Sequence, residues 1–261
     1  MNKALYGCIL VCAVLIGIIE LSWGMEAFDK NTITYLDVSK NLLEHIKYNE
    51  PYADELGILK EAAEKNLLRE LKDDAAKKAF LINLYNSFAQ ILLKDNPALY
   101  ENKEAFFTGK TFTVSGNKIS LNDIERCMLR RTKPMLIPFY IYDKFISSFK
   151  RGCRVAKNDY RIHFALNCNA RSCPPVLYYD AERIDDQLSL AAAAYLESSV
   201  KYSREENSIY LPEIFRWYKS DFGGAEGILN ILRQHNIVAA GESPVFRYVK
   251  WDWTPAVKPF R

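Results

Sequence analysis

The spacing of apolar residues along the N-terminal half of the chain is helical. It predicts helices over residues 35–48, 56–71 and 75–94, the last preceded by the capping residues Asp73 and Asp74. The third helix is apolar on nearly every face, unlike the second, which carries many charges. We expect this third helix to be buried at the centre of the fold, because no face of it suits solvent.

Amide side chains interrupt this central helix at Asn83, Asn86 and Gln90. Asn83 and Asn86 are three residues apart and therefore share one face. Buried amides need hydrogen-bond partners, because their desolvation is otherwise unfavourable. Two compatible roles follow. The amides bond loop backbone and fix its packing, or they line a cleft and orient a substrate or a catalytic group. The loop at residues 167–173 is a candidate partner.

Short strands are expected between the helices. Residues 112–119 indicate a hairpin with Gly116 and Asn117 in its turn, and residues 161–166 alternate as a buried strand. Helices dominate, and no linker rich in Gly, Ser or Pro interrupts the chain. The pattern predicts an α+β fold: a helix-rich single domain over residues 25–261, packed around a small, mainly antiparallel sheet.

The first residues have the pattern of a secretory signal peptide. Lys3 precedes an apolar run from Ala4 to Ile19, and small residues follow within residues 22–24. The run is shorter than the roughly 20 residues that a membrane-spanning helix needs. We expect a signal peptide over residues 1–24 and an exported protein, periplasmic or secreted. An uncleaved N-terminal anchor is the alternative, and no other membrane contact is expected.

The amino-acid composition and the absence of certain motifs limit the kinds of molecule that the protein is expected to bind. Hydrophobic residues make up 49% of the chain and charged residues 26%, and the net charge of +3 gives no warrant for nucleic-acid binding. Phosphate-loop, dinucleotide and serine-hydrolase motifs are absent, so no cofactor is expected. The expected partner is a peptide-like or small-molecule ligand.

Residues 161–175 concentrate the reactive residue types. They include His163, one of three histidines, and Cys168 and Cys173, two of six cysteines, with Arg171 between the two thiols. A strand that runs into a polar loop commonly presents such groups at the edge of a fold. Residues 161–175 contain no Cys-x-x-Cys motif and no pair of histidines, so no metal site is expected.

A cysteine nucleophile is the chemistry that this stretch favours. Cys168 would act as a thiolate, with His163 as its base and with Glu125 or Asn83 orienting the imidazole. The Asn86 amide, or backbone N–H groups of the loop after the nucleophile, would stabilise an oxyanion. Acyl transfer or amide hydrolysis through a thioester would follow.

Arg171 and Cys173 complete the candidate site as residues that bind or orient the substrate. An exported chain loses its first two cysteines with the signal, and the remaining four allow three pairings in an oxidising compartment. The alternative to a reactive thiol is therefore a structural disulfide, for which Cys168 and Cys173 are a candidate pair. The four cysteines are Cys127, Cys153, Cys168 and Cys173.

Several segments, in order along the chain, carry a family pattern. They are Ala79-Phe-Leu-Ile-Asn-Leu-Tyr-Asn86, Ile119-Ser-Leu-Asn-Asp-Ile-Glu125 with Leu129-Arg130, Arg161-Ile-His-Phe-Ala-Leu-Asn-Cys-Asn-Ala-Arg-Ser-Cys-Pro-Pro175, Ile214-Phe-Arg-Trp-Tyr218, Asp221-Phe-Gly223 and Trp251-Asp-Trp253. Together they resemble the DUF547 family, a domain of unknown function common in exported bacterial proteins, over about residues 60–255. The resemblance implies a papain- or transglutaminase-like thiol site and a fold like that of a cysteine protease.

One position departs from the family pattern. Family members often carry histidine after the glutamate, in an Ile-Glu-His order, and this chain has Arg126 there. If that histidine serves as the base, His163 is the nearby substitute. Two hypotheses remain: an exported cysteine-dependent hydrolase or acyltransferase for peptide-like or amide substrates, and a non-catalytic exported binding or scaffold domain that retains the cleft. Arg126 favours the second, and the clustered Cys, His and Arg favour the first.

Overall fold

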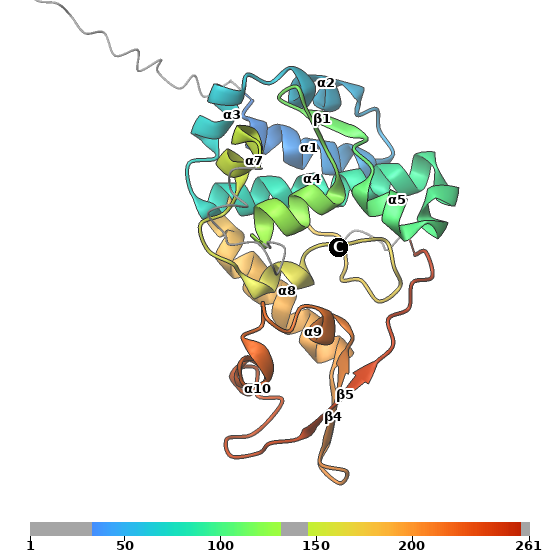
Figure 1. The fold of residues 1–261 in the computed structure, drawn as a ribbon, viewed down its shortest axis with the longest axis vertical. Coiled ribbons are helices and arrows are strands. Elements are labelled where there is room, and N and C mark those ends of the chain that lie inside the picture. The colour runs from blue at the N-terminus through green and yellow to red at the C-terminus, as the bar shows by residue number, and fades with distance from the viewer. Residues whose placement is uncertain (1–32, 132–145, 257–261) are drawn as a thin grey trace, which may run out of the picture. The chain divides into compact units, whose positions relative to one another are not determined.

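The computed structural model of the protein describes residues 33–131 and 146–256. The expected signal peptide lies outside these residues and stays a prediction. Within them, no helix has the length and apolar character needed to cross a membrane. The fold is α+β and helix-rich, as the sequence predicts, and within the described residues its strands form two small sheets (Figure 1).

The central helix α4 (Asp74–Asp95) organises the N-terminal part of the fold. Its predicted position is confirmed, and Asp73 caps it by accepting the amide of Ala76 at 2.9 Å. Every residue from 78 to 92 is buried. The helix α1 (Tyr35–Tyr48) packs along it (Figure 1). This burial explains why almost every face of α4 is apolar.

Shorter helices surround α4. The predicted helix over residues 56–71 is in fact two helices, because the backbone at Ala62 leaves helical geometry (φ −53°, ψ 128°). The short helices of this part are α2 (Ala53–Glu61), α3 (Glu64–Glu70), η1 (Pro97–Glu101), α5 (Lys103–Thr108) and α7 (Ser148–Cys153).

The strands β1 (Phe112–Val114) and β2 (Asn117–Ile119) form the predicted hairpin. Ser115 and Gly116 occupy the turn, in place of the predicted Gly116 and Asn117, with φ of 48° and 69°. Positive φ at both central residues matches the twist of a two-residue hairpin. The turn docks on α2, since the Ser115 amide donates to the Leu59 carbonyl at 2.8 Å.

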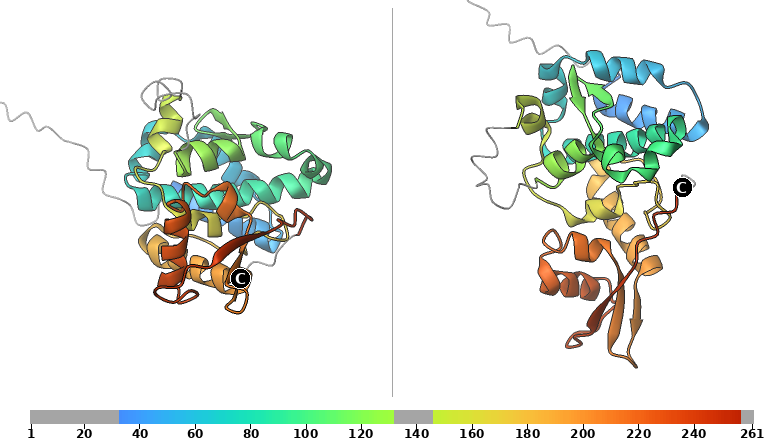
Figure 2. Two further views of the ribbon diagram at one scale, coloured as in Figure 1. Left: turned by 60° about the horizontal axis from the view of Figure 1, so that its bottom comes forward. Right: turned by 45° about the vertical axis from the view of Figure 1, so that its right-hand side comes forward.

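The C-terminal part holds the second sheet and the helices around it. Its elements in order are η4 (Ala181–Arg183), α8 (Ile184–Ser199), β3 (Lys201–Ser203), β4 (Ser208–Pro212), α9 (Ile214–Trp217), α10 (Gly224–Gln234) and β5 (Val245–Val249). The strand β4 pairs antiparallel with β3 and parallel with β5. A parallel pair needs a crossover, which α9 and α10 supply (Figure 2).

The predicted strand over residues 161–166 is wrong. The chain forms a 3-10 helix there, η3 (Tyr160–Phe164), and Asp159 caps it by accepting the amide of Arg161 at 3.1 Å. The side chains from Ile162 to Leu166 are all buried, His163 among them. A short apolar run that is buried all round does not distinguish strand from helix by its periodicity.

Two hydrophobic clusters fill the interior of the described residues. The first surrounds α4, and the second lies between α8, β4 and α10. The segment that carries the reactive residues belongs to both. Ile162 and Ala165 pack in the first cluster, whereas Phe164 and Cys173 pack in the second. The fold therefore places this segment at the seam between the clusters.

Candidate functional site

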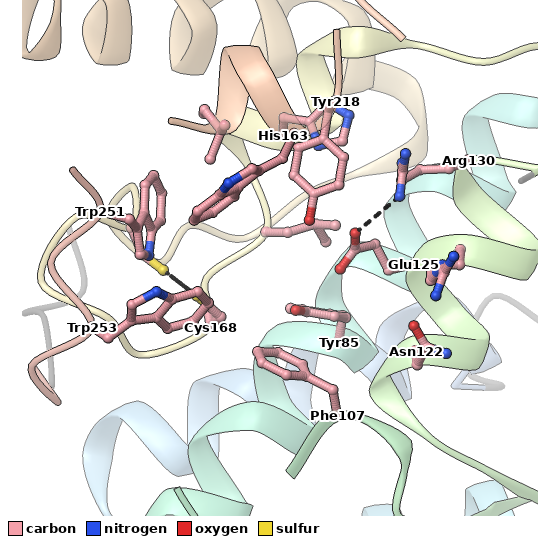
Figure 3. Close-up of a pocket in the computed structure, with 15 residues that line it drawn as sticks. Tyr85, Phe107, Asn122, Glu125, Arg130, His163, Cys168, Tyr218, Trp251 and Trp253 are labelled. Atoms are coloured by element: carbon pink, nitrogen blue, oxygen red, sulfur yellow. Dashed lines mark hydrogen bonds and ion pairs between the residues drawn. The ribbon is translucent and has the colours of Figure 1, made fainter. Parts of the chain in front are cut away.

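A cavity of about 580 Å³ collects residues from distant parts of the chain (Figure 3). Aromatic side chains with a few polar and charged groups form its lining, as is typical of sites for small ligands. The three residues predicted as catalytic, Cys168, His163 and Glu125, all line it. The full lining is Tyr85, Phe107, Asn122, Glu125, Arg126, Arg130, His163, Leu166, Cys168, Cys173, Ile214, Trp217, Tyr218, Trp251 and Trp253.

Glu125 reaches the cavity from a wide helical turn, η2 (Asp123–Leu129). The turn is a π-helix, in which the Arg130 amide donates to the Glu125 carbonyl, five residues back, at 2.8 Å. Residues five apart point about 140° apart on an α-helix. The wider turn brings them closer to one face, so Glu125 Oε1 and Arg130 Nη1 form an ion pair at 3.5 Å. Single π-turns of this kind are frequent at functional sites.

Arg130 links Glu125 to a second acid, Asp221. Its Nε lies 2.5 Å from Asp221 Oδ2, and its guanidinium lies over the Tyr218 ring at 4.2 Å. The same Asp221 oxygen is 2.9 Å from Nε2 of His163, whose ring stacks on Tyr218 with 4.1 Å between centroids. Arg130, Glu125, His163 and Tyr218 line one side of the cavity (Figure 3), and Asp221, which is not among the lining residues, joins Arg130 to His163.

This network fixes the charges of its members. Burial by itself raises the pKa of Asp221, but hydrogen bonds from His163 and Arg130 outweigh it and hold that pKa at about 2. Burial lowers the pKa of His163, against the opposite pull of Asp221. At neutral pH His163 is therefore neutral and donates its Nε2–H to the Asp221 carboxylate. The orienting partner of His163 is Asp221, where the sequence suggested Glu125 or Asn83.

Amides of α4 hold the loop that carries the cysteines. Asn83 exchanges two hydrogen bonds with the backbone of Tyr179, at 2.9 and 3.0 Å. Asn86 donates to the Ala165 carbonyl at 3.0 Å and accepts the Asn167 amide at 2.8 Å. Both side chains thus fix loop backbone, which is the first of the two roles considered from sequence, and neither lines the cavity.

The N–H groups expected to stabilise an oxyanion are already engaged. The Asn169 amide donates to a side chain of the loop at 2.7 Å, and the Arg171 amide donates to a carbonyl of the C-terminal segment at 2.9 Å. The Ala170 amide bonds the Cys168 sulfur, where it favours the thiolate. The hydroxyl of Tyr85, by contrast, points into the cavity (Figure 3).

Cys168 and Cys173 face each other as thiols. Their sulfur atoms are 2.6 Å apart, and the Cys168 amide donates to the Cys173 sulfur at 3.2 Å. Cys168 is partly exposed, whereas Cys173 is 1% exposed. The hydrogen bond with Cys173, and then burial, raise the pKa of Cys168 well above its usual value, so this thiol is protonated at neutral pH. The indoles of Trp251 and Trp253 flank it (Figure 3).

Of the remaining residues that the sequence singled out, Arg126 lines the cavity and the others do not. The Arg171 side chain is 66% exposed and lies 3.7 Å from Asp252, away from the lining. Cys153 ends α7, and burial raises its pKa to about 12, while Cys127 is buried on η2. Arg126 does line the cavity, at the position where the family pattern often has histidine.

Sequence reasoning missed the Arg130–Asp221 pair and most of the aromatic lining. An arginine near a helix C-terminus suits the helix dipole, and that ordinary explanation concealed its buried role. One available signal was its position directly after the apolar run at residues 127–129, which places it beside the core. Tyr85 gave no such signal, because it belongs to a helix that is apolar all round.

Within residues 33–131 and 146–256, no group of three or more His, Cys, Asp or Glu side chains is placed to hold a metal ion. A family model described as "Protein of unknown function, DUF547" matches residues 68–196. No curated protein and no solved structure matches the chain. The matched range contains α4, η2 and the cysteine loop, whereas the cavity residues from 214 to 253 lie beyond it.

Proposed function

Because the chain belongs to the DUF547 family, whose function is unknown, we propose a function from the chemistry of the cavity. The protein is an exported, cysteine-dependent hydrolase or acyltransferase for peptide-like or amide substrates, with Cys168 as its nucleophile. One observation carries the proposal. Cys168, His163 and Glu125, the residue types that thiol-based acyl transfer uses, line a single ligand-sized cavity.

Attack by Cys168 on a carbonyl carbon begins the reaction. The thiol is protonated at neutral pH, so in this scheme its proton passes to the carboxylate of Glu125, which lines the same cavity, directly or through one bridging water. The carbonyl oxygen gains the electron pair and accepts a hydrogen bond from Tyr85. Glu125 then protonates the leaving amine as the C–N bond breaks. Water or another amine finally releases the acyl group from the thioester.

The raised pKa of Cys168 determines the expected pH dependence. A thiol that is protonated at neutral pH becomes a better nucleophile as the pH rises, so kcat/KM should increase into the alkaline range. His163 serves as a positioning residue in this scheme. His163 contacts Asp221, and Asp221 forms an ion pair with Arg130. Arg130 also pairs with Glu125, so His163 helps to position the Glu125 carboxylate.

Turnover of reduced protein on a panel of fluorogenic peptide amides and thioesters tests the proposal. Cys168→Ser should abolish turnover, and Tyr85→Phe should lower kcat by about 10²–10³-fold, the usual effect of losing one oxyanion donor. The matched control is Cys153→Ala, which removes a buried thiol that does not line the cavity and should leave turnover unchanged. Turnover that survives Cys168→Ser undiminished would refute the assignment.

A second candidate is a non-catalytic exported binding domain. The protonated state of Cys168 favours it, since a neutral thiol is a poor nucleophile. Its ligand would stack on Trp251 and Trp253 and change their fluorescence. Saturable quenching that Trp253→Ala removes, with no Cys168-dependent turnover of any panel member, would favour this candidate over the enzyme.

A further inference from the structure

The cysteine loop holds a second thiol that acyl transfer does not need. The sulfur atoms of Cys168 and Cys173 are 2.6 Å apart. A disulfide bond is about 2.05 Å long, so a movement of roughly half an ångström joins the two sulfurs.

The loop backbone around the thiols is fixed by buried amide side chains. Asn167 donates to the Pro174 carbonyl at 2.5 Å, which ties the two ends of the loop together. Asn169 donates to the Ala89 carbonyl at 2.7 Å and accepts a hydrogen bond from Gln90, which ties its middle to α4. These bonds involve no sulfur, so they hold the loop in the same place whether the cysteines are reduced or oxidised.

The two thiols differ in access. Cys168 is partly exposed, whereas Cys173 is 1% exposed and packs in the second hydrophobic cluster. Cys127 and Cys153 are also buried. A small disulfide that enters the cavity therefore meets one sulfur first. An accessible thiol with a buried neighbour in bonding range is the arrangement in which one cysteine attacks and the other resolves.

We propose that Cys168 and Cys173 form a reversible dithiol–disulfide centre that exchanges with low-molecular-weight disulfides, with Cys168 as the attacking and Cys173 as the resolving cysteine. The Cys168 sulfur, having lost its proton to solvent, attacks one sulfur of the small disulfide, which releases one thiolate and leaves a mixed disulfide on Cys168. Cys173 then loses its own proton to the thiolate just released or to solvent, attacks the Cys168 sulfur and expels the second small thiolate. The two cysteines lose two electrons, and the small disulfide gains them.

The test uses the reduced full-length chain with oxidised glutathione as the probe. After incubation, alkylation and mass spectrometry identify the state of each cysteine. The second step is intramolecular between positioned groups, so the Cys168–Cys173 disulfide should exceed the glutathione adduct by at least about ten-fold at millimolar glutathione. Dithiothreitol should restore both thiols. Because the assay needs no acyl substrate, its outcome is independent of the proposed hydrolase activity.

Two variants locate the roles. Cys173→Ala should accumulate a glutathione adduct on Cys168, because no resolving thiol remains, and Cys153→Ala should behave as the unmodified chain. A lasting Cys168 adduct in the unmodified chain would overturn the proposal, since Cys173 would not be resolving. So would a Cys168 thiol that oxidised glutathione leaves unchanged in the folded protein. Both outcomes are read on the unmodified chain, so the proposal stays testable even if a variant fails to fold.

Discussion

Removal of the Asn86 amide tests how far the buried amides of α4 stabilise the fold. Asn86→Ala breaks two buried hydrogen bonds, with the Ala165 carbonyl at 3.0 Å and the Asn167 amide at 2.8 Å. Each bond contributes about 1 kcal/mol net, but each backbone group left buried without a partner costs about 1–3 kcal/mol. The side chain is 0% exposed, so water does not replace the lost partners without a rearrangement. We expect a loss of about 2–4 kcal/mol in the free energy of unfolding.

The neighbouring Ser87 provides a matched control. It lies on the same helix and is equally buried, but its hydroxyl has no hydrogen-bond partner within the described part of the chain. Ser87→Ala removes a polar group that gains nothing from burial and adds a better helix former, so stability should stay the same or rise by up to about 1 kcal/mol. Urea unfolding at pH 7 measures both variants. Equal midpoints for Asn86→Ala and Ser87→Ala would refute the reasoning.

Three further predictions concern the pH dependence of stability and the space around two glycines. Because burial lowers the pKa of His163, the unfolded chain takes up this proton first, and stability should fall as the pH drops below about 6.5. His163→Gln should flatten that loss between pH 7 and pH 5, as followed by urea midpoints. A Cβ at Gly227 would lie 2.0 Å from the Phe222 carbonyl oxygen, so Gly227→Ala should destabilise the fold by more than about 2 kcal/mol. At Gly57, inside α2, a Cβ meets nothing within 4 Å, and Gly57→Ala should raise stability by about 0.5–1 kcal/mol in the same unfolding assay.

Much of the fold was predictable where the local signal and the tertiary environment agree. Apolar residues on nearly every face of α4 indicate that the helix is buried on all sides. Its capping residue Asp73 lies directly before the apolar pattern begins. The amides of Asn83 and Asn86 required partners, and loop backbone supplies them. In each case the physical requirement belongs to the residue itself and does not depend on how distant segments meet.

The parts that sequence did not predict depend on how segments meet. The pairing of His163 with Asp221 joins residues 58 apart along the chain, and no spacing rule relates them. The π-turn brings Glu125 and Arg130 closer to one face. It differs from an α-helix only in that its hydrogen bonds join residues five apart instead of four apart. Residues 160–164 form a 3-10 helix in place of the predicted strand, and the burial of every side chain from Ile162 to Leu166 removes the polar positions that would have distinguished the two.

The position of the cavity follows from the seam between the two hydrophobic clusters. Tyr85 and Leu166 stand in or beside the first cluster, whereas Cys173 and Trp251 stand in the second. The cavity is lined by residues of both clusters, so its shape depends on the cysteine loop, which runs from one cluster to the other. The amide bonds from α4 fix that loop to the first cluster, and its thiols face the aromatic residues of the second. A change that loosens the loop from α4, such as Asn86→Ala, should therefore alter the alkylation rate of Cys168 and lower stability, whereas Ser87→Ala should leave the alkylation rate unchanged and should not lower stability.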